Sequence, residues 1–393
     1  MTSAATIDLA GILQIPATIK AIIWDMDGVL VDTLSADHGL CVTAATQVLG
    51  SGDWISHEDV RRNFALDPPA FWAALVRAAP RKVSPQELTK LIAVYDDLRA
   101  ETKFAVLPGV AEVLTACEAS GIKCAVASSN PTEVIADILD RAGIKTRFTL
   151  VSGLGANGVK PKPAGDLYTR AAEALHVQPA HCAFIEDSVT GLTAGKAAGL
   201  GYAIAVATGS ASFDSLTAST LPHITYQRFE PRRCTLIDGK PIQKTLDTPN
   251  DFASHMAEHI AWRLGVGIDL AWRSDDWYGL GHFIGSSVKR LPFRKGSASA
   301  LGMIDDGASE VLIAFDEPPG LDFSVHADLA RDRIERMRVE QIKHGSDLLK
   351  MLKGFADGLG VHITARMCTF EDPHHSWEGL FRAVGICLAR LRA

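Results

Sequence analysis

The stretch IIWDMDGVLVDT, residues 22–33, decides the fold of the first half of the chain. An apolar run ends in two acids, Asp25 and Asp27, which are followed by Gly28. This pattern is typical of a buried strand that delivers polar side chains to the edge of a sheet, where open α/β folds bind ligands. Residues two apart on a strand point the same way, so the two carboxylates share one side. A solvated turn would explain one Asp but not the whole string.

Two neighbouring carboxylates suit two kinds of chemistry. A divalent cation relieves their repulsion, and an Asp can attack phosphorus to form an aspartyl-phosphate. Later apolar runs also end in polar residues, with Ser128 after one and Asp187 after another. Because the carboxyl ends of parallel strands form one edge of a sheet, we expect these side chains to gather near Asp25.

In order along the chain, residues 22–33, 125–130, 162–168 and 184–191 resemble the four motifs of the haloacid dehalogenase superfamily. The match is to the branch of the small-sugar phosphatases and beta-phosphoglucomutase, and it covers roughly residues 19–228. The resemblance implies a phosphoric monoester hydrolase with Asp25 as nucleophile and Asp27 as general acid and base. It also implies four phosphate-binding residues, which are Ser128, Ser129, Asn130 and Lys162. Lys160 is a competing candidate for the role of Lys162.

The same resemblance implies Mg²⁺ as cofactor. Asp25, Asp187 and the Asp27 carbonyl are the expected ligands, and Glu186 is expected to be a direct ligand or a neighbour of one. The metal offsets the repulsion between a phosphate and the attacking carboxylate.

Helix and strand patterns alternate through most of the first half, which predicts a doubly wound, parallel, Rossmann-like α/β core. Only helical patterns occupy residues 34–103, and the resemblance implies that they form an all-helical cap. We expect residues 1–18 to be a short leader. The expected domains are a core at 19–33 and 104–228, the cap at 34–103, a charged, proline-containing linker at 229–242, and a C-terminal domain at 243–393.

The C-terminal part contains a faint repeat at an offset of roughly 95 residues, each unit reading helix, strand, acidic turn, helix. This predicts an α+β domain made of two similar units. Residues 252–256, 303–306 and 374–378 resemble the His-bearing helix, the acidic turn and the HHxxE motif of imidazoleglycerol-phosphate dehydratase. That family implies Mn²⁺, and the candidate ligands for a second metal are His255, His374, His375 and Glu378.

Half of the expected ligand set is missing. Trp277, Tyr278 and Gly281 stand where the first unit should carry HHxxE, and Lys350 replaces the second helix histidine. An indole ring, a glycine and an ammonium group cannot bind Mn²⁺, so we expect an inactive dehydratase-like domain. A non-catalytic oligomerisation module stays open as an alternative. Trp272, Trp277 and Tyr278 would suit an interface between subunits, but they could equally belong to the core. We expect His259 to lie on a partly exposed helical face.

The substrate is expected to be a small phosphorylated metabolite. The cap segment that contains the candidate specificity residues Asn63, Phe64 and Asp67 is more apolar than a sugar bisphosphate would need, which favours hydrolysis over phosphoglucomutase-like transfer. Because one half resembles a histidine-biosynthesis enzyme, a bifunctional histidine-biosynthesis protein that cleaves histidinol phosphate is a further alternative. Sugar and polyol phosphates stay open as well.

Bulk composition excludes several classes of protein. The 393 residues are 47% hydrophobic and 22% charged, which indicates a globular chain of two or more domains. A net charge of −7 without a basic block argues against nucleic acid as a partner. No apolar run approaches a membrane span. Seven scattered cysteines without a CxxC pair indicate reduced thiols and a cytoplasmic location.

Overall fold

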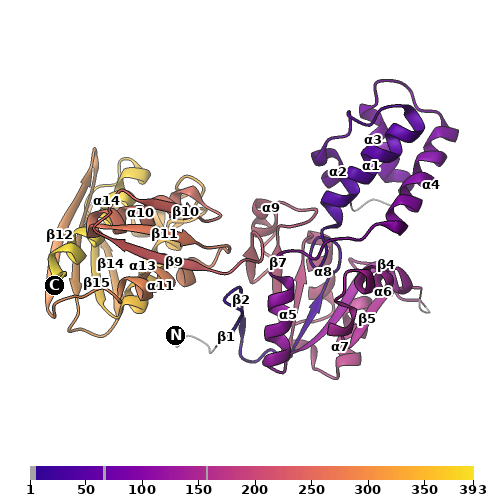
Figure 1. The fold of residues 1–393 in the computed structure, drawn as a ribbon. Coiled ribbons are helices and arrows are strands. Elements are labelled where there is room, and N and C mark those ends of the chain that lie inside the picture. The colour runs from indigo at the N-terminus through magenta and orange to yellow at the C-terminus, as the bar shows by residue number, and fades with distance from the viewer. Residues whose placement is uncertain (1–5, 65–67, 156–157) are drawn as a thin grey trace. The chain divides into compact units, whose positions relative to one another are not determined.

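The computed structural model describes residues 6–64, 68–155 and 158–393. It divides into two compact units, Met1–Pro231 and Arg232–Ala393 (Figure 1). A search of the described residues finds no helix with the length and apolarity that crossing a membrane requires.

A six-stranded parallel sheet forms the centre of the first unit. Its central strands are rich in apolar residues, as expected for a parallel sheet with both faces covered. In spatial order the strands are β5 (Leu150–Leu154), β4 (Lys123–Pro131), β3 (Ala21–Trp24), β6 (Cys182–Glu186), β7 (Tyr202–Val206) and β8 (Ile224–Tyr226).

Strand β3 shows how the two faces are covered. Ile22 and Trp24 belong to one hydrophobic cluster, whereas Ala21 and Ile23 belong to another. The first cluster includes α5 (Val110–Ala119) and α6 (Thr132–Arg141); the second includes α7 (Asp166–Leu175), α8 (Val189–Ala197) and α9 (Phe213–Ala218). Single 3₁₀ turns lie at Lys145–Arg147 and Pro179–His181. The predicted doubly wound α/β core is confirmed.

Between β3 and β4 the chain forms a helical region with a hydrophobic cluster of its own, which includes Trp72, Leu91 and Tyr95. Its elements are α1 (Thr33–Leu49), α2 (His57–Asn63), α3 (Pro68–Leu75), a 3₁₀ turn (Val76–Ala78) and α4 (Pro85–Glu101). Ser84 and Glu87 form a capping box that begins α4, because each side chain satisfies a free N–H of the first turn. We call this region the cap.

The residues expected to be a leader include a β-hairpin, β1 (Thr6–Leu9) and β2 (Leu13–Pro16). Leu9, Leu13 and Ile15 are fully buried in the core of the first unit. Within β2, the buried Leu13 and Ile15 alternate with half-buried residues. Sequence analysis missed this short period-2 pattern.

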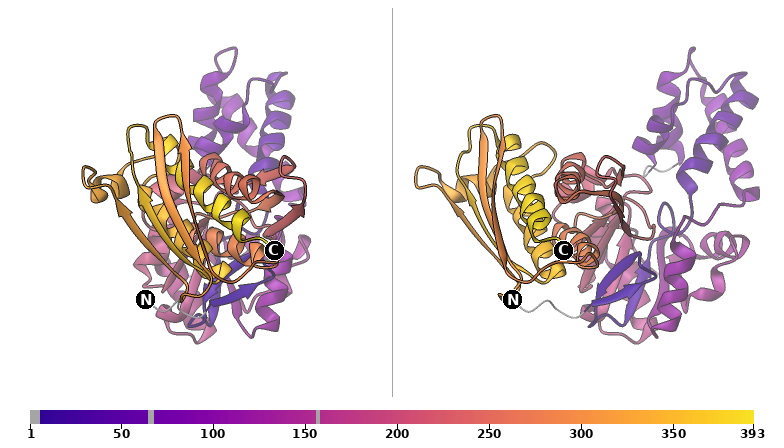
Figure 2. Two further views of the ribbon diagram at one scale, coloured as in Figure 1. Left: turned by 90° about the vertical axis from the view of Figure 1, so that its left-hand side faces the viewer. Right: turned by 60° about the vertical axis from the view of Figure 1, so that its left-hand side comes forward.

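The second unit has two sheets and a layer of helices (Figure 2). The three-stranded sheet runs β10 (Lys244–Asp247), β11 (Val266–Ala271), β9 (Arg233–Asp238). The four-stranded sheet runs β12 (Ser297–Ile304), β13 (Gly307–Ala314), β15 (His362–Met367), β14 (Gly320–Val325). The helices are α10 (Asp251–Leu264), α11 (Trp277–Val288), α12 (Arg331–Arg336), α13 (Gly345–Leu359) and α14 (Pro373–Leu391).

Helix, strand and helix occur in the same order twice, as α10–β11–α11 and as α13–β15–α14. Helix α10 packs on α14 and α11 packs on α13, within one hydrophobic cluster. The expected linker contains β9, which pairs with β11 and buries Cys234. The charge and proline content of this segment predicted a linker. An edge strand of a sheet also exposes polar side chains, so its composition resembles that of a linker.

Candidate functional site

The site of the first unit forms where β3, β4 and β6 end. The backbone N–H of Asp25 donates to the Ile185 carbonyl (3.0 Å), which joins the ends of β3 and β6. Asp25, Ser128, Glu186 and Asp187 are all buried at this edge, although each is polar. Buried polar groups without a structural partner are costly, so their concentration here marks a functional site.

Lys162 reaches the centre of this cluster. Its Nζ lies 2.5 Å from Asp25 Oδ1 and 2.5 Å from Glu186 Oε1. Burial opposes the lysine charge, but the two carboxylates outweigh it and raise the pKa of Lys162. Glu186 also accepts hydrogen bonds from the Tyr168 hydroxyl (2.6 Å) and from Ser188 Oγ (3.2 Å). The expected competitor, Lys160, has an exposed side chain.

Asp25, Glu186 and Asp187 each offer a carboxylate oxygen, and these oxygens lie within 4.8 Å of one another. Burial raises the pKa of Asp25 well above its ordinary value, with further contributions from Glu186 and Asp187. Burial, and then Glu186, raise the pKa of Asp187 to about 7, although Ser210 donates to it from its backbone N–H (2.6 Å) and its hydroxyl (3.1 Å). Three buried carboxylates face one ammonium group, and this excess of negative charge suits a divalent cation.

The Asp27 side chain points to a different set of partners. Its Oδ2 accepts from the Asn130 amide (2.5 Å), and its Oδ1 lies 3.3 Å from Nη2 of Arg99. Arg99 comes from α4 of the cap, and its Nε also donates to Asp37 (3.2 Å) in α1. Burial raises the pKa of Asp37 to about 6 even though Arg99 opposes the shift. An arginine in the last turn of a cap helix carries no motif, so sequence analysis missed it.

The predicted phosphate-binding residues divide into two groups. Ser128 Oγ is buried and accepts from the backbone and side-chain N–H groups of Asn130 (3.3 and 3.2 Å). Ser129 Oγ instead accepts from the backbone N–H of Lys162 (3.4 Å), so it supports the segment that carries this lysine. The loop that follows Asp27 requires glycine: Gly28 has φ +71°, and a Cβ there would lie 2.6 Å from Gly209 Cα.

The candidate specificity residues that the structure describes make their contacts within the cap. Asn63 donates to the Asp59 carbonyl of its own helix (2.7 Å), and Phe64 packs against the hydrophobic cluster of the cap. Asp67 lies outside the described residues. The residue of α2 that reaches the core is Arg61, whose Nη1 donates to the Ser210 carbonyl (3.4 Å).

In the second unit, side chains of α10 and α14 converge on Glu378. His259 Nε2 lies 2.7 Å from one carboxylate oxygen, and Nε2 of His255 and of His374 lie 3.5 Å from the other. The expectation that His259 is partly exposed was wrong: it is 4% exposed, and burial, with His255 next, lowers its pKa to about 3. His375 turns away and pairs with Asp306 (2.9 Å).

The residues that stand where the dehydratase resemblance expects metal ligands have structural roles. Gly281 faces the backbone of α13, where a Cβ would collide with the Met351 carbonyl oxygen. Trp277 packs against the core, and the Tyr278 hydroxyl donates to Asp357 (2.7 Å). These residues therefore hold α11 to the rest of the unit.

Comparison with known proteins supports the assignment of the first unit. Residues 19–199 match the family model "haloacid dehalogenase-like hydrolase". Protein CbbY of Rhodobacter capsulatus is 30% identical over 46% of this chain and 83% of that protein. Hexitol phosphatase B of Escherichia coli (strain K12) is 29% identical over 47% of this chain and 83% of that protein.

Phosphoglycolate phosphatase of the same organism is 30% identical over 46% of this chain and 79% of that protein. Among solved structures, a HAD family hydrolase from Deinococcus radiodurans R1 is 26% identical, with a TM-score of 0.45 over 52% of this chain and 89% of that one. The expected enzyme class, phosphoric monoester hydrolase, is confirmed. On the strength of the family match and of these relatives, the chain belongs to the haloacid dehalogenase-like hydrolases.

Proposed function

We propose that the first unit hydrolyses a small phosphomonoester with the help of Mg²⁺ and through an aspartyl-phosphate on Asp25. The observation that carries this proposal is the buried cluster in which Asp25 meets Lys162 on one side and Asp187 on the other. The relatives named above include phosphatases of a hexitol phosphate and of phosphoglycolate, which supports a small substrate.

In the first half-reaction a carboxylate oxygen of Asp25 attacks phosphorus. The new oxygen–phosphorus bond forms as the ester bond breaks, and Asp27 gives its proton to the leaving oxygen. Lys162 neutralises the charge of the phosphoryl oxygens, and the Ser128 hydroxyl donates to one of them. Asn130 and Arg99 hold the Asp27 carboxyl in place through the hydrogen bonds described above.

In the second half-reaction Asp27 takes a proton from water, whose oxygen attacks the aspartyl-phosphate. The bond between Asp25 and phosphorus breaks, inorganic phosphate leaves, and both carboxyl groups return to their starting protonation states. Asp25 and Asp187 would hold Mg²⁺ together with the Asp27 carbonyl, and Glu186, which is occupied by Lys162 and Tyr168, would support them. When bound, this ion neutralises the charge that otherwise keeps a phosphate away from the carboxylates.

Asp25→Asn tests the mechanism. We expect phosphate release to fall on the order of 10⁴-fold or more, because an amide is no nucleophile. Initial rates would be measured with Mg²⁺ on a panel that includes histidinol phosphate, sugar phosphates and polyol phosphates. The control is Asp53→Asn, an exposed acid of the cap. Substantial turnover by a folded Asp25→Asn protein would reject the aspartyl-phosphate, and transfer without release would favour the phosphoglucomutase alternative.

For the second unit we propose a transition-metal centre formed by His255, His259 and Glu378, with His374 beside them. Three imidazoles and one carboxylate form a donor set of the kind that binds first-row transition metals, with Mn²⁺ as one candidate. The buried Nδ1 of His259 has no hydrogen-bond partner among the described residues, so its ring is held mainly by the contacts of Nε2. If histidinol phosphate proves to be the substrate of the first unit, both halves would serve histidine synthesis.

Elemental analysis after dialysis, and titration with Mn²⁺ or Zn²⁺, test this centre. We expect His259→Gln or Glu378→Gln to lower metal affinity by about tenfold or more. The matched control is His375→Gln, since this neighbouring histidine points to Asp306 instead. Equal metal binding by all of these variants would place the metal elsewhere or show that the cluster is purely structural.

A further inference from the structure

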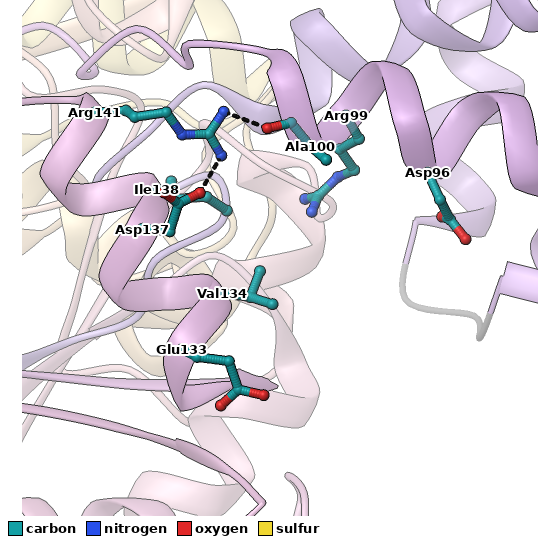
Figure 3. A pocket seen from close by; sticks show the side chains of 8 residues that line it. All are labelled: Asp96, Arg99, Ala100, Glu133, Val134, Asp137, Ile138 and Arg141. Carbon is teal, nitrogen blue, oxygen red and sulfur yellow. Dashed lines mark hydrogen bonds and ion pairs between the residues drawn. The ribbon is translucent and has the colours of Figure 1, made fainter.

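A pocket of about 350 Å³ lies between the cap and the core of the first unit (Figure 3). Helix α4 of the cap forms one wall, and helix α6 of the core forms the other. This volume is in the range of sites for small molecules. The lining residues are Asp96, Arg99, Ala100, Glu133, Val134, Asp137, Ile138 and Arg141.

Arg99 connects the pocket to the catalytic acid. Arg99 lines it and also contacts Asp27 (3.3 Å), which would protonate the leaving oxygen. Helix α6 begins at Thr132, two residues after Asn130, whose amide donates to the same carboxylate. A leaving group that extends past Asp27 and Arg99 from a phosphate at Asp25 would therefore meet α4 and α6.

Both positive charges of the pocket are already neutralised. Arg99 contacts Asp27 and Asp37. Arg141 contacts Asp137 (2.5 Å) and donates to the carbonyls of Ala100 (2.6 Å) and Thr102 (2.8 Å), as Figure 3 shows in part. A second phosphate or a carboxylate entering the pocket would therefore find no free cation among its lining residues.

Two acids remain. Asp96 and Glu133 come from opposite walls and are both exposed. Among the described residues, neither side chain makes a hydrogen bond or ion pair, although the charge of Arg99 acts on Asp96. Apolar surface lies between them, and Val134 is 36% exposed. Two exposed carboxylates beside apolar surface complement an alkyl or aromatic group that ends in a cation.

We propose that the substrate is a phosphomonoester whose leaving group carries a cationic amine, which Asp96 and Glu133 bind. This inference rests on the proposed phosphatase function and specifies the substrate class of that same site. It also explains why the pocket would reject a sugar bisphosphate, whose second phosphate would face the two acids.

The test compares aminoalkyl phosphates of three to five carbons with alkyl phosphates and carboxyalkyl phosphates of equal length. We expect the full-length protein to prefer the amine by about tenfold in kcat/KM, since each partly exposed ion pair contributes modestly. In the Asp96→Asn/Glu133→Gln double variant, the ratio of kcat/KM for the aminoalkyl phosphate to kcat/KM for the alkyl phosphate should approach one. The matched control is Asp140→Asn, an exposed acid of α6 outside the pocket, which should keep the preference.

The outcomes separate this inference from the proposed function. Hydrolysis that depends on Asp25 but shows no preference for the amine would overturn the substrate class and leave the phosphatase intact. The same holds if the double variant keeps the preference of the parent protein. No hydrolysis of any phosphate on the panel would overturn both.

Discussion

Arg99 shows how one residue of the cap takes part in the chemistry of the core. It is held between Asp27, the proposed general acid, and the buried Asp37. Because α4 carries Arg99, any movement of this helix would also move the charge that faces Asp27. The arginine therefore links the position of the cap to the electrostatics of the catalytic acid.

Asp37 should make stability depend on pH. Its pKa is about 6 in the folded protein against an ordinary value of 3.8, so the folded state binds the proton more tightly. The resulting stabilisation is fully present below pH 3.8 and is lost as pH rises through about 6; it amounts to about 3 kcal/mol. Calorimetry of Asp37→Asn checks this.

We expect the difference in melting temperature between the parent protein and Asp37→Asn to increase by a few degrees, in favour of the parent, as pH falls from 7 to 5. Asp53→Asn, an exposed control, should follow the parent. A constant difference between the parent and Asp37→Asn across this range would contradict the pKa assigned to Asp37.

Residues with motif character were predictable from sequence, and residues that act through tertiary contacts were not. Asp25, Asp27 and Asp187 stand directly after apolar runs, so strand ends alone place them at one edge of the sheet. Ser210 contributes hydrogen bonds to Asp187 from a distant segment, and no local pattern marks it. His259 was misjudged because burial of a helix face depends on what packs against it.

At the scale of elements, the crossing of α11 and α13 depends on glycines from both helices. A Cβ at Gly281 or Gly285 would collide with backbone of α13, and one at Gly354 or Gly358 would collide with backbone of α11. The two backbones therefore approach each other directly, without side chains between them.

Gly281→Ala should destabilise the second unit by about 2 kcal/mol or more, because the helices must separate. Gly39→Ala in α1 is the control: it has open space and a helical conformation, so removing a helical glycine should stabilise by up to about 1 kcal/mol. Thermal unfolding distinguishes the two. A neutral Gly281→Ala would mean that the crossing adjusts without cost.

Elements with a clear apolar pattern were predicted well, whereas short, partly exposed strands were not. Helices α7 and α4 and strands β3 and β7 have apolar spacing over a whole segment. Strands β1, β2 and β9 are four to six residues long and partly exposed, so their patterns resemble those of loops.

At the scale of the whole molecule, all groups of the proposed phosphatase lie before residue 232, since the site extends from Asp25 to Ser210. We expect a protein truncated after Pro231 to fold and to keep its kcat/KM within a factor of about three. Rates and circular dichroism of this fragment would check it. A folded but inactive fragment would assign part of the site to the second unit.

The Gly281 crossing also limits how this protein can change over evolution. A single nucleotide can convert a glycine codon to a glutamate codon, which would place a carboxylate at this position. The α13 backbone occupies that space, so such a change first requires another change that moves the helix. A carboxylate at position 281 therefore needs at least two mutational steps.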